Sequence, residues 1–328
     1  MSSATARAFF NRWVRWPLEG AVVFLLLGAV RLIPADAASA TGGWIGRSLG
    51  PLLPVSKVGR LNLKMAFPEK SEAERRAILK AMWENIGRTA FEYPHLGHLS
   101  HPDSGRFEVV NEKPIAEAYF AERPGVYFGA HLGNFEVVPL YAARRGLTLH
   151  AFARAPNNPL FAKVVAKIRG TGGARLLSKQ AGGMLGAINV LRQNGYLGVL
   201  IDQKQNRGAP IPFFGREAMT AIVPAQLALR FNAAVLVGRT ERLKGARFRI
   251  TVSDPWELPA SGDRDADALE LTRRITAEVE RWVREKPEDW LWLHRRWPDA
   301  LYYTPEQLAR RKRRRRKARE ARQESSRS

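Results

Sequence analysis

The middle of the chain alternates short apolar runs of strand length with segments of helical spacing, and this alternation restricts the fold more than any other feature. The strand-like runs are 125–130, 147–153, 195–201, 233–240 and 247–253, and the helical segments are 159–169, 180–193, 220–231 and 265–285. Strands separated by helices of this length pair in a mixed, largely parallel sheet covered by helices. A further helix is predicted before them, because Ser71 and Glu74 form a capping box ahead of a helical apolar pattern. We therefore expect one α/β domain over 55–303.

Residues 1–54 differ from this domain and are expected to form a membrane anchor and a linker. Phe, Trp and Arg residues alternate near the start, and an uncharged apolar run of 11 residues follows, from Gly20 to Val30. The run is shorter than the roughly 20 residues that cross a bilayer comfortably. A secretory signal, a marginal transmembrane helix and a buried core helix are alternatives. A helix lying in the membrane interface fits the Trp and Arg flanks best.

Residues 304–328 form a basic tail with almost nothing to bury, so a folded element is not expected there. The tail is a solvated segment, a ligand for anionic phospholipid headgroups, or a nucleic-acid contact. The chain as a whole has 53 Lys and Arg against 31 Asp and Glu, a net charge of +22, which favours a polyanionic partner. There is no cysteine, which excludes a disulfide framework, a thiolate nucleophile and a Cys-type zinc site.

Three motifs are interpreted as structural. The stretch "GRSLG" (46–50) matches the nucleophile elbow of α/β-hydrolases but lies outside the α/β region, so it is expected to be a loop. In "HLGHLSH", His95, His98 and His101 recur every third residue, but the glycine, serine and proline nearby favour a surface loop over a metal site. The glycines of 169–177 and 180–187 match no phosphate-binding fingerprint and are expected in turns and helix starts.

The segment "HLGNFE" is the strongest candidate for catalysis. His131 follows the strand-like run 125–130, at the sheet edge where α/β proteins bind ligands. Pro139 places the start of the next helix close to Glu136, and Gly146 ends it. The glycine and asparagine between His131 and Glu136 allow the carboxylate to fold back onto the imidazole, and such a pair can remove a proton from an alcohol. By this pattern alone, a chance meeting at a turn stays open.

Several segments resemble one known family. "HLGNFE" is similar to the H-x4-D/E motif of the glycerolipid acyltransferase superfamily, and its glutamate matches the bacterial lipid A lauroyl/myristoyl acyltransferase branch. The other similar segments are "RLNLKMAFPEKSEAER" (60–75), "RAPNNPLF" (154–161), "IDQKQNRGAPIPFFGREAMT" (201–220) and "PEDWLWLHRRW" (287–297). They follow the family order over roughly 60–298.

The resemblance implies roles for individual residues. His131 would be the general base and Glu136 its partner, while Arg154, Arg169 and Asp202 fall on positions that would bind substrate. An arginine there can bind a lipid phosphate or an oxyanion, and Asp202 can orient that arginine or hold a sugar hydroxyl. An internal salt bridge among them is the structural alternative. For His294, Arg295 and Arg296 in "WLWLHRRW", a packed structural corner is the favoured interpretation.

The implied activity is direct transfer of an acyl chain from an acyl carrier protein thioester to a hydroxyl of a lipid A precursor. No serine or cysteine is placed to form an acyl-enzyme, and no metal or cofactor is implied. The expected location is the cytoplasmic face of a bacterial inner membrane, on anionic phospholipids and without nucleic acid. Two alternatives remain: an acyltransferase of the phosphatidylinositol-mannoside type, and a non-catalytic basic membrane- or nucleic-acid-binding protein. The segment "IDQKQN" departs from the pattern of this family, and the chain also has an extended arginine-rich tail. Both features leave the acceptor sugar and the length of the acyl chain open.

Overall fold

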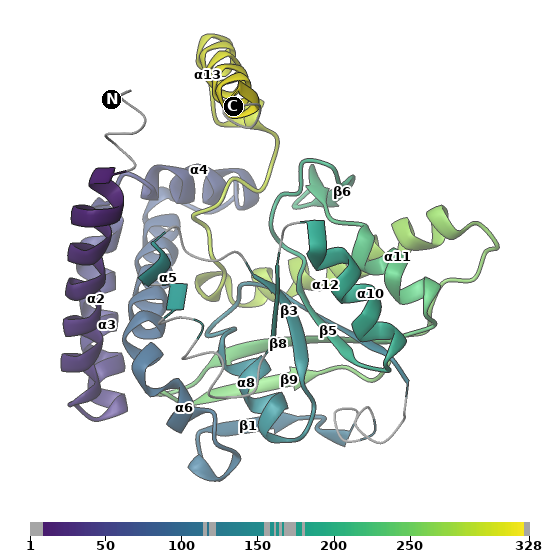
Figure 1. Cartoon of the computed structure of the whole chain (residues 1–328), viewed down its shortest axis with the longest axis horizontal. Coiled ribbons are helices and arrows are strands. Elements are labelled where there is room, and N and C mark those ends of the chain that lie inside the picture. Colours follow the sequence, from purple (N-terminus) through teal and green to yellow (C-terminus); the bar gives the residue numbers. More distant parts are fainter. Residues whose placement is uncertain are drawn as a thin grey trace.

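The computed structural model describes residues 9–113, 117, 123–153, 158–160, 162–163, 166, 175–178 and 181–324. Its centre is a seven-stranded mixed sheet with the order β1-β9-β8-β2-β5-β3-β4 (Figure 1). The strands are β1 (Phe107–Val110), β2 (Gly125–Gly129), β3 (Leu149–Ala153), β4 (Arg175–Ser178), β5 (Tyr196–Leu200), β8 (Ala234–Arg242) and β9 (Phe248–Val252). All neighbours pair in parallel except β8 and β9. The predicted largely parallel sheet is confirmed, and β1 and β4 are additional strands.

Helices cover both faces of this sheet, as expected. They are α5 (Glu72–Glu92), α8 (Val137–Arg144), α10 (Ala181–Arg192), α11 (Val223–Arg230) and α12 (Arg264–Glu285). Side chains alternate along each strand, so Val126 and Phe128 of β2 face the larger core with α5, α10, α11 and α12. Tyr127 points the other way and packs with α8. The capping box that begins α5 is present.

A separate hairpin joins β6 (Ala209–Phe213) to β7 (Arg216–Thr220). Its two turn residues, Phe214 and Gly215, both have positive φ angles, of 53° and 66°. This backbone suits the tight connection between antiparallel strands. Phe213 and Phe214 are buried and pack against Trp290 and Trp292, and these contacts hold the hairpin against the core.

Helix α3 (Ala35–Leu49) packs antiparallel along α5, and it contains most of "GRSLG". The expectation of a loop there is wrong, because small residues let the two helices touch. A Cβ atom added to Gly42 would lie 2.3 Å from the Gly87 carbonyl oxygen, and one added to Gly46 would lie 2.2 Å from the Trp83 carbonyl oxygen. Ser48 is exposed to solvent at the far end of α3.

A continuous helical segment from Asn11 to Arg31, which includes α2 (Trp16–Arg31), is long and apolar enough to cross a membrane. It lies on one flank of the molecule beside α3 (Figure 1). Its large apolar side chains are exposed, among them Leu18, Phe24 and Leu25, and none of its residues is buried in the protein. The interpretation of this segment as a buried core helix is therefore wrong.

The histidine-rich segment is also helical rather than a loop. It forms short helices at Tyr93–His95 (η3), Leu96–Leu99 (α6) and Pro102–Ser104 (η4). Leu96 and Leu99 are fully buried, and their spacing of three residues favours a helical turn that places both in the core.

Most of the basic tail is helical too, as α13 (Pro305–Glu324), which projects away from the body (Figure 1). The expectation that this segment forms no folded element is wrong. Its Arg, Lys, Ala, Glu and Gln residues are strong helix formers. Thr304 and Gln307 cap its start with reciprocal hydrogen bonds.

Helix α4 (Ser56–Ala66) lies between α3 and α5 in the sequence.

Candidate active site at the carboxyl edge of the sheet

The candidate site is built on the turn that joins β2 to α8. Gly133 has a φ of +54°, and a Cβ atom there would lie 2.5 Å from the Thr240 carbonyl oxygen, so only glycine fits this close approach. Glu136 occupies the N-cap position of α8, and Gly146, with a φ of 92°, follows the end of that helix. The predicted position of His131 after the strand and the predicted limits of the helix are confirmed.

The carboxylate bonded to the His131 ring is that of Asp202. Asp202 Oδ1 lies 2.8 Å from His131 Nδ1, and Asp202 Oδ2 accepts the His131 backbone N–H at 3.1 Å. Trp290 Nε1 donates to the same Oδ2 at 2.8 Å. The His131 carbonyl in turn accepts the Leu291 N–H at 3.1 Å. Both the ring and the backbone of His131 are thus held in place.

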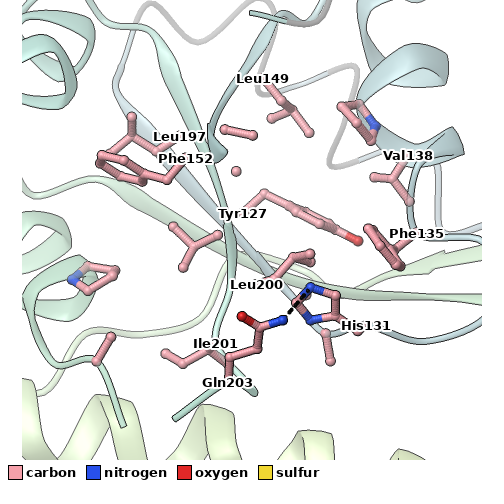
Figure 2. A pocket seen from close by; sticks show the side chains of 18 of the residues that line it. Tyr127, His131, Phe135, Val138, Leu149, Phe152, Leu197, Leu200, Ile201 and Gln203 are labelled. Carbon is pink, nitrogen blue, oxygen red and sulfur yellow. Dashed lines mark hydrogen bonds between the residues drawn. The ribbon is translucent and has the colours of Figure 1, made fainter. Parts of the chain in front are cut away.

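The Asp202 side chain is fully buried. Burial alone would raise the pKa of this carboxyl, but the charge and the hydrogen bonds of His131 outweigh it and hold the pKa well below its usual range. An ionised Asp202 accepts the Nδ1 proton of a neutral imidazole, which leaves the Nε2 lone pair free to take a proton. Gln203 Nε2 lies 3.1 Å from that nitrogen, a contact that Figure 2 draws as a dashed line, so a group that gives up a proton fits at this position.

Behind Asp202 lies a corner of aromatic and basic side chains. Trp290, Trp292 and Trp297 are completely buried. His294 Nε2 lies 3.1 Å from the Asp202 carbonyl oxygen, and the completely buried Arg296 donates to the Thr220 hydroxyl at 2.7 Å. Residues 290–297 are therefore a packed structural corner, as expected, and this corner supports Asp202.

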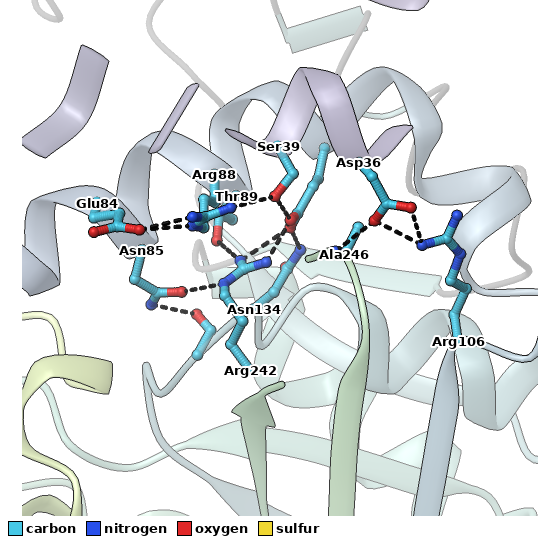
Figure 3. Close-up of polar contacts among 12 residues, drawn as sticks. Asp36, Ser39, Glu84, Asn85, Arg88, Thr89, Arg106, Asn134, Arg242 and Ala246 are labelled. Atoms are coloured by element: carbon cyan, nitrogen blue, oxygen red, sulfur yellow. Dashed lines mark hydrogen bonds and ion pairs between the residues drawn. The ribbon is translucent and has the colours of Figure 1, made fainter. Parts of the chain in front are cut away.

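A second polar group holds the turn from the side of α5. Asn134 Nδ2 donates to Glu92 Oε2 at 2.8 Å, and Asn85 Nδ2 donates to the Gly133 carbonyl at 3.2 Å (Figure 3). The Glu92 carboxylate is fully buried and pairs with Arg242 of β8 through two hydrogen bonds, one of them 3.0 Å long. Ser39 of α3 donates to the same carboxylate at 2.7 Å. The turn that joins β2 to α8 is thus connected to α3, α5 and β8 by buried hydrogen bonds.

A cavity of about 650 Å³ opens beside His131 and is large enough for part of a lipid. Leu149, Phe152, Leu197 and Leu200 give it apolar walls, which Figure 2 shows around Tyr127. Gly198 also lines it, and a Cβ atom there would lie 3.6 Å from Leu149 Cβ and 3.8 Å from Ala151 Cβ, so a larger side chain would extend over this wall. The polar residues at its wall include Glu136, Lys204, Arg207 and Arg239. This combination suits a long apolar ligand with a polar reacting end.

The predicted site residues have different outcomes. Asp202 lies at His131, where its carboxylate oxygens bind the histidine and Trp290 rather than a described arginine. Glu136 is buried and lines the same cavity as His131, while its predicted pairing with the imidazole stays a prediction. Arg154 and Arg169 lie outside the described residues. Among the described residues no group of three or more His, Asp or Glu side chains is arranged to hold a metal ion.

The pairing of Asp202 with His131 and the contact of Gln203 were not predicted from the sequence. Both follow from the strand order, because β2 and β5 are parallel neighbours and their carboxyl ends lie at one edge of the sheet. The Glu92–Asn134 hydrogen bond was not predicted either, since no short motif indicates it.

Comparison with known proteins identifies similar chains. A family model described as bacterial lipid A biosynthesis acyltransferase matches residues 7–299. The lipid A biosynthesis myristoyltransferase of Escherichia coli (strain K12) is 26% identical over 255 residues, which is 76% of this chain and 77% of that protein. The lipid A biosynthesis lauroyltransferase of the same organism is 23% identical over 248 residues, 74% of this chain and 78% of that protein. Lipid A biosynthesis acyltransferase 1 of Shigella flexneri is 26% identical over 255 residues, with coverage of 76% and 77%.

Proposed function

The chain belongs to the bacterial lipid A biosynthesis acyltransferase family, and we propose that it moves a fatty acyl chain from an acyl carrier protein thioester to a hydroxyl of a lipid A precursor. One observation supports this proposal above the others. It is the His131–Asp202 pair, which directs His131 Nε2 toward Gln203 at the wall of an apolar cavity. A base beside a lipid-sized cavity is what the transfer of an acyl chain to an alcohol requires.

In the proposed reaction His131 Nε2 takes the proton of the acceptor hydroxyl after Gln203 has moved aside. The alkoxide oxygen attacks the thioester carbonyl carbon, the carbon–sulfur bond breaks, and the thiolate leaves with the proton from the imidazolium. Asp202 keeps the reactive tautomer and stabilises the imidazolium between these steps. Glu136 would be the second acidic partner at the cavity wall. No covalent acyl-enzyme is formed, and the chain's own residues supply every proton transfer.

The acyl chain would lie in the apolar cavity, with its carbonyl carbon near His131. Arg154 and Arg169 would bind the phosphates of the acceptor, together with Lys204 or Arg207 at the wall of the cavity. The donor protein is acidic and the acceptor is anionic, so a net charge of +22 favours the encounter of both with this chain. A phosphatidylinositol-mannoside acceptor is the alternative within the same chemistry.

We further propose that residues 1–54 anchor the catalytic domain (55–303) to the cytoplasmic face of the inner membrane, and that the tail (304–328) binds anionic phospholipids. Both ends of α2 contact the body. Asn158 Nδ2 donates to the Trp16 carbonyl at 3.0 Å, and His95 Nε2 lies 3.1 Å from the Val30 carbonyl. Because both ends of α2 are hydrogen-bonded to the body of the protein, we expect this helix to lie in the membrane interface rather than across the bilayer.

The test is acyl transfer by purified protein in detergent, with radiolabelled tetra-acylated lipid A precursor and a panel of acyl carrier protein thioesters. His131→Ala and Glu136→Ala should lower transfer by about 10²–10⁴-fold, the usual contribution of a positioned base. His98→Ala is the matched control, because this histidine is exposed and remote from the cavity lining. Transfer that survives His131→Ala would exclude the proposed base. A wild-type protein that binds the lipid but transfers no chain would indicate another acceptor or a binding protein.

A further inference from the structure

Thr240 of β8 carries a buried hydroxyl for which the described residues provide no hydrogen-bond partner. The residue is 3% exposed and lines the same cavity as His131. Burial without a hydrogen bond costs free energy, and valine would fill the same space without that cost. Unsatisfied buried hydroxyls are rare in folded proteins, and one at the wall of a substrate cavity indicates a bond that forms when substrate is present.

The position of Thr240 follows from the strand pairing. β8 runs parallel to β2, with Val237 opposite Phe128, so the carboxyl ends of both strands lie at the same edge of the sheet. A Cβ atom on Gly133 would lie 2.5 Å from the Thr240 carbonyl oxygen, so Thr240 lies against the turn that carries His131. Thr240 and His131 both line the cavity at this edge.

Three backbone donors of the turn that joins β2 to α8 are already engaged. The His131 N–H donates to Asp202, the Leu132 N–H to the Ala130 carbonyl at 2.7 Å, and the Gly133 N–H to the Asp289 carbonyl at 3.0 Å. These three groups therefore do not form an oxyanion hole. Among the charged side chains at the cavity wall, Lys204 is paired with Asp299 and Arg239 with Glu285. Arg239 Nε has an ion-pair contact of 3.4 Å with Glu241, and Arg207 is assigned above to the phosphates of the acceptor. The Thr240 hydroxyl is a further donor at this wall and has no hydrogen-bond partner among the described residues.

We propose that the Thr240 hydroxyl donates a hydrogen bond to the carbonyl oxygen of the acyl thioester and stabilises the negative charge that develops there. The attacking oxygen bonds to the carbonyl carbon, the electron pair of the C=O bond moves to that oxygen, and it returns when the thiolate leaves. Thr240 keeps its own proton throughout. This inference rests on the proposed acyl transfer.

The test compares Thr240→Val with Thr240→Ser in the transfer assay and in urea unfolding. Thr240→Val removes the hydroxyl and preserves the shape, so kcat should fall by about 10²–10³-fold, the usual effect of losing one oxyanion donor. KM for the thioester should change little. The urea midpoint of Thr240→Val should equal or exceed that of the wild type, because no native hydrogen bond is lost. Thr240→Ser should keep most of kcat.

A Thr240→Val variant with wild-type kcat would overturn the proposal. So would a fall in kcat accompanied by an equal loss of stability and no recovery in Thr240→Ser, because that pattern indicates a structural role. A wild-type protein that transfers no acyl chain overturns the proposed function and this inference together. An active wild type with an equally active Thr240→Val overturns this inference alone.

Discussion

The buried pair of Glu92 and Arg242 offers the sharpest test of how the turn that joins β2 to α8 is supported. The Glu92 side chain is fully buried, and the Arg242 side chain is 8% exposed. Glu92→Gln keeps the shape of the side chain but leaves the guanidinium buried without a counter-charge. Breaking such a pair from one side costs about 3–5 kcal/mol. Arg242→Met should cost a similar amount, because it leaves a buried carboxylate with only Ser39 and Asn134 as donors.

The double variant Glu92→Gln/Arg242→Met should be more stable than the sum of the two single effects predicts, by more than about 2 kcal/mol. It buries no unpaired charge, and replacing both members of a buried pair is often close to neutral. Urea unfolding in detergent, monitored by tryptophan fluorescence, gives the free energy of unfolding of the wild type and of each of the three variants. Additive losses would refute the reasoning, because they would show that the two side chains contribute independently.

Three further predictions concern the site and its supports. Asp202→Asn should lower kcat, because the neutral amide no longer stabilises the imidazolium that forms on His131 during the reaction, and a wild-type kcat in this variant would contradict the pairing. Gly46→Ala should destabilise the protein by about 1–3 kcal/mol in urea unfolding, since the new Cβ atom would lie 2.2 Å from the Trp83 carbonyl oxygen. Gly28→Ala is the control and should leave the stability unchanged, because nothing lies within 4 Å of a Cβ atom there. Gly198→Val should shift the preferred donor toward shorter acyl chains in a competition among thioesters, because it fills the cavity beside Leu149, and an unchanged preference would exclude this cavity as the chain site.

Elements with strong local signals were predicted from the sequence, and those that depend on tertiary packing were not. The run 125–130 contains β2, which is fully buried, so its apolar composition was sufficient to predict a strand. β1 alternates between half-buried and exposed residues over only four positions, which is too short a pattern to separate from a loop. Helix α3 is rich in glycine, and it is helical because those glycines let it pack closely against α5. Local propensity disfavours glycine in helices, so only the packing partner explains α3.

The site shows the same division between local and long-range information. His131 and the start of α8 could be placed from a few adjacent residues, whereas Asp202 lies 71 residues away from its histidine. The apolar cores of β2, β5 and β8 are alike in sequence character, so nothing local says which strands are neighbours. Once β5 and β8 are known to flank β2, the residues that follow β5 and the carboxyl end of β8 must lie at the same edge of the sheet as His131. Asp202 and Thr240 therefore become candidates for the reaction through strand order, and motif spacing alone could not pair either of them with the histidine.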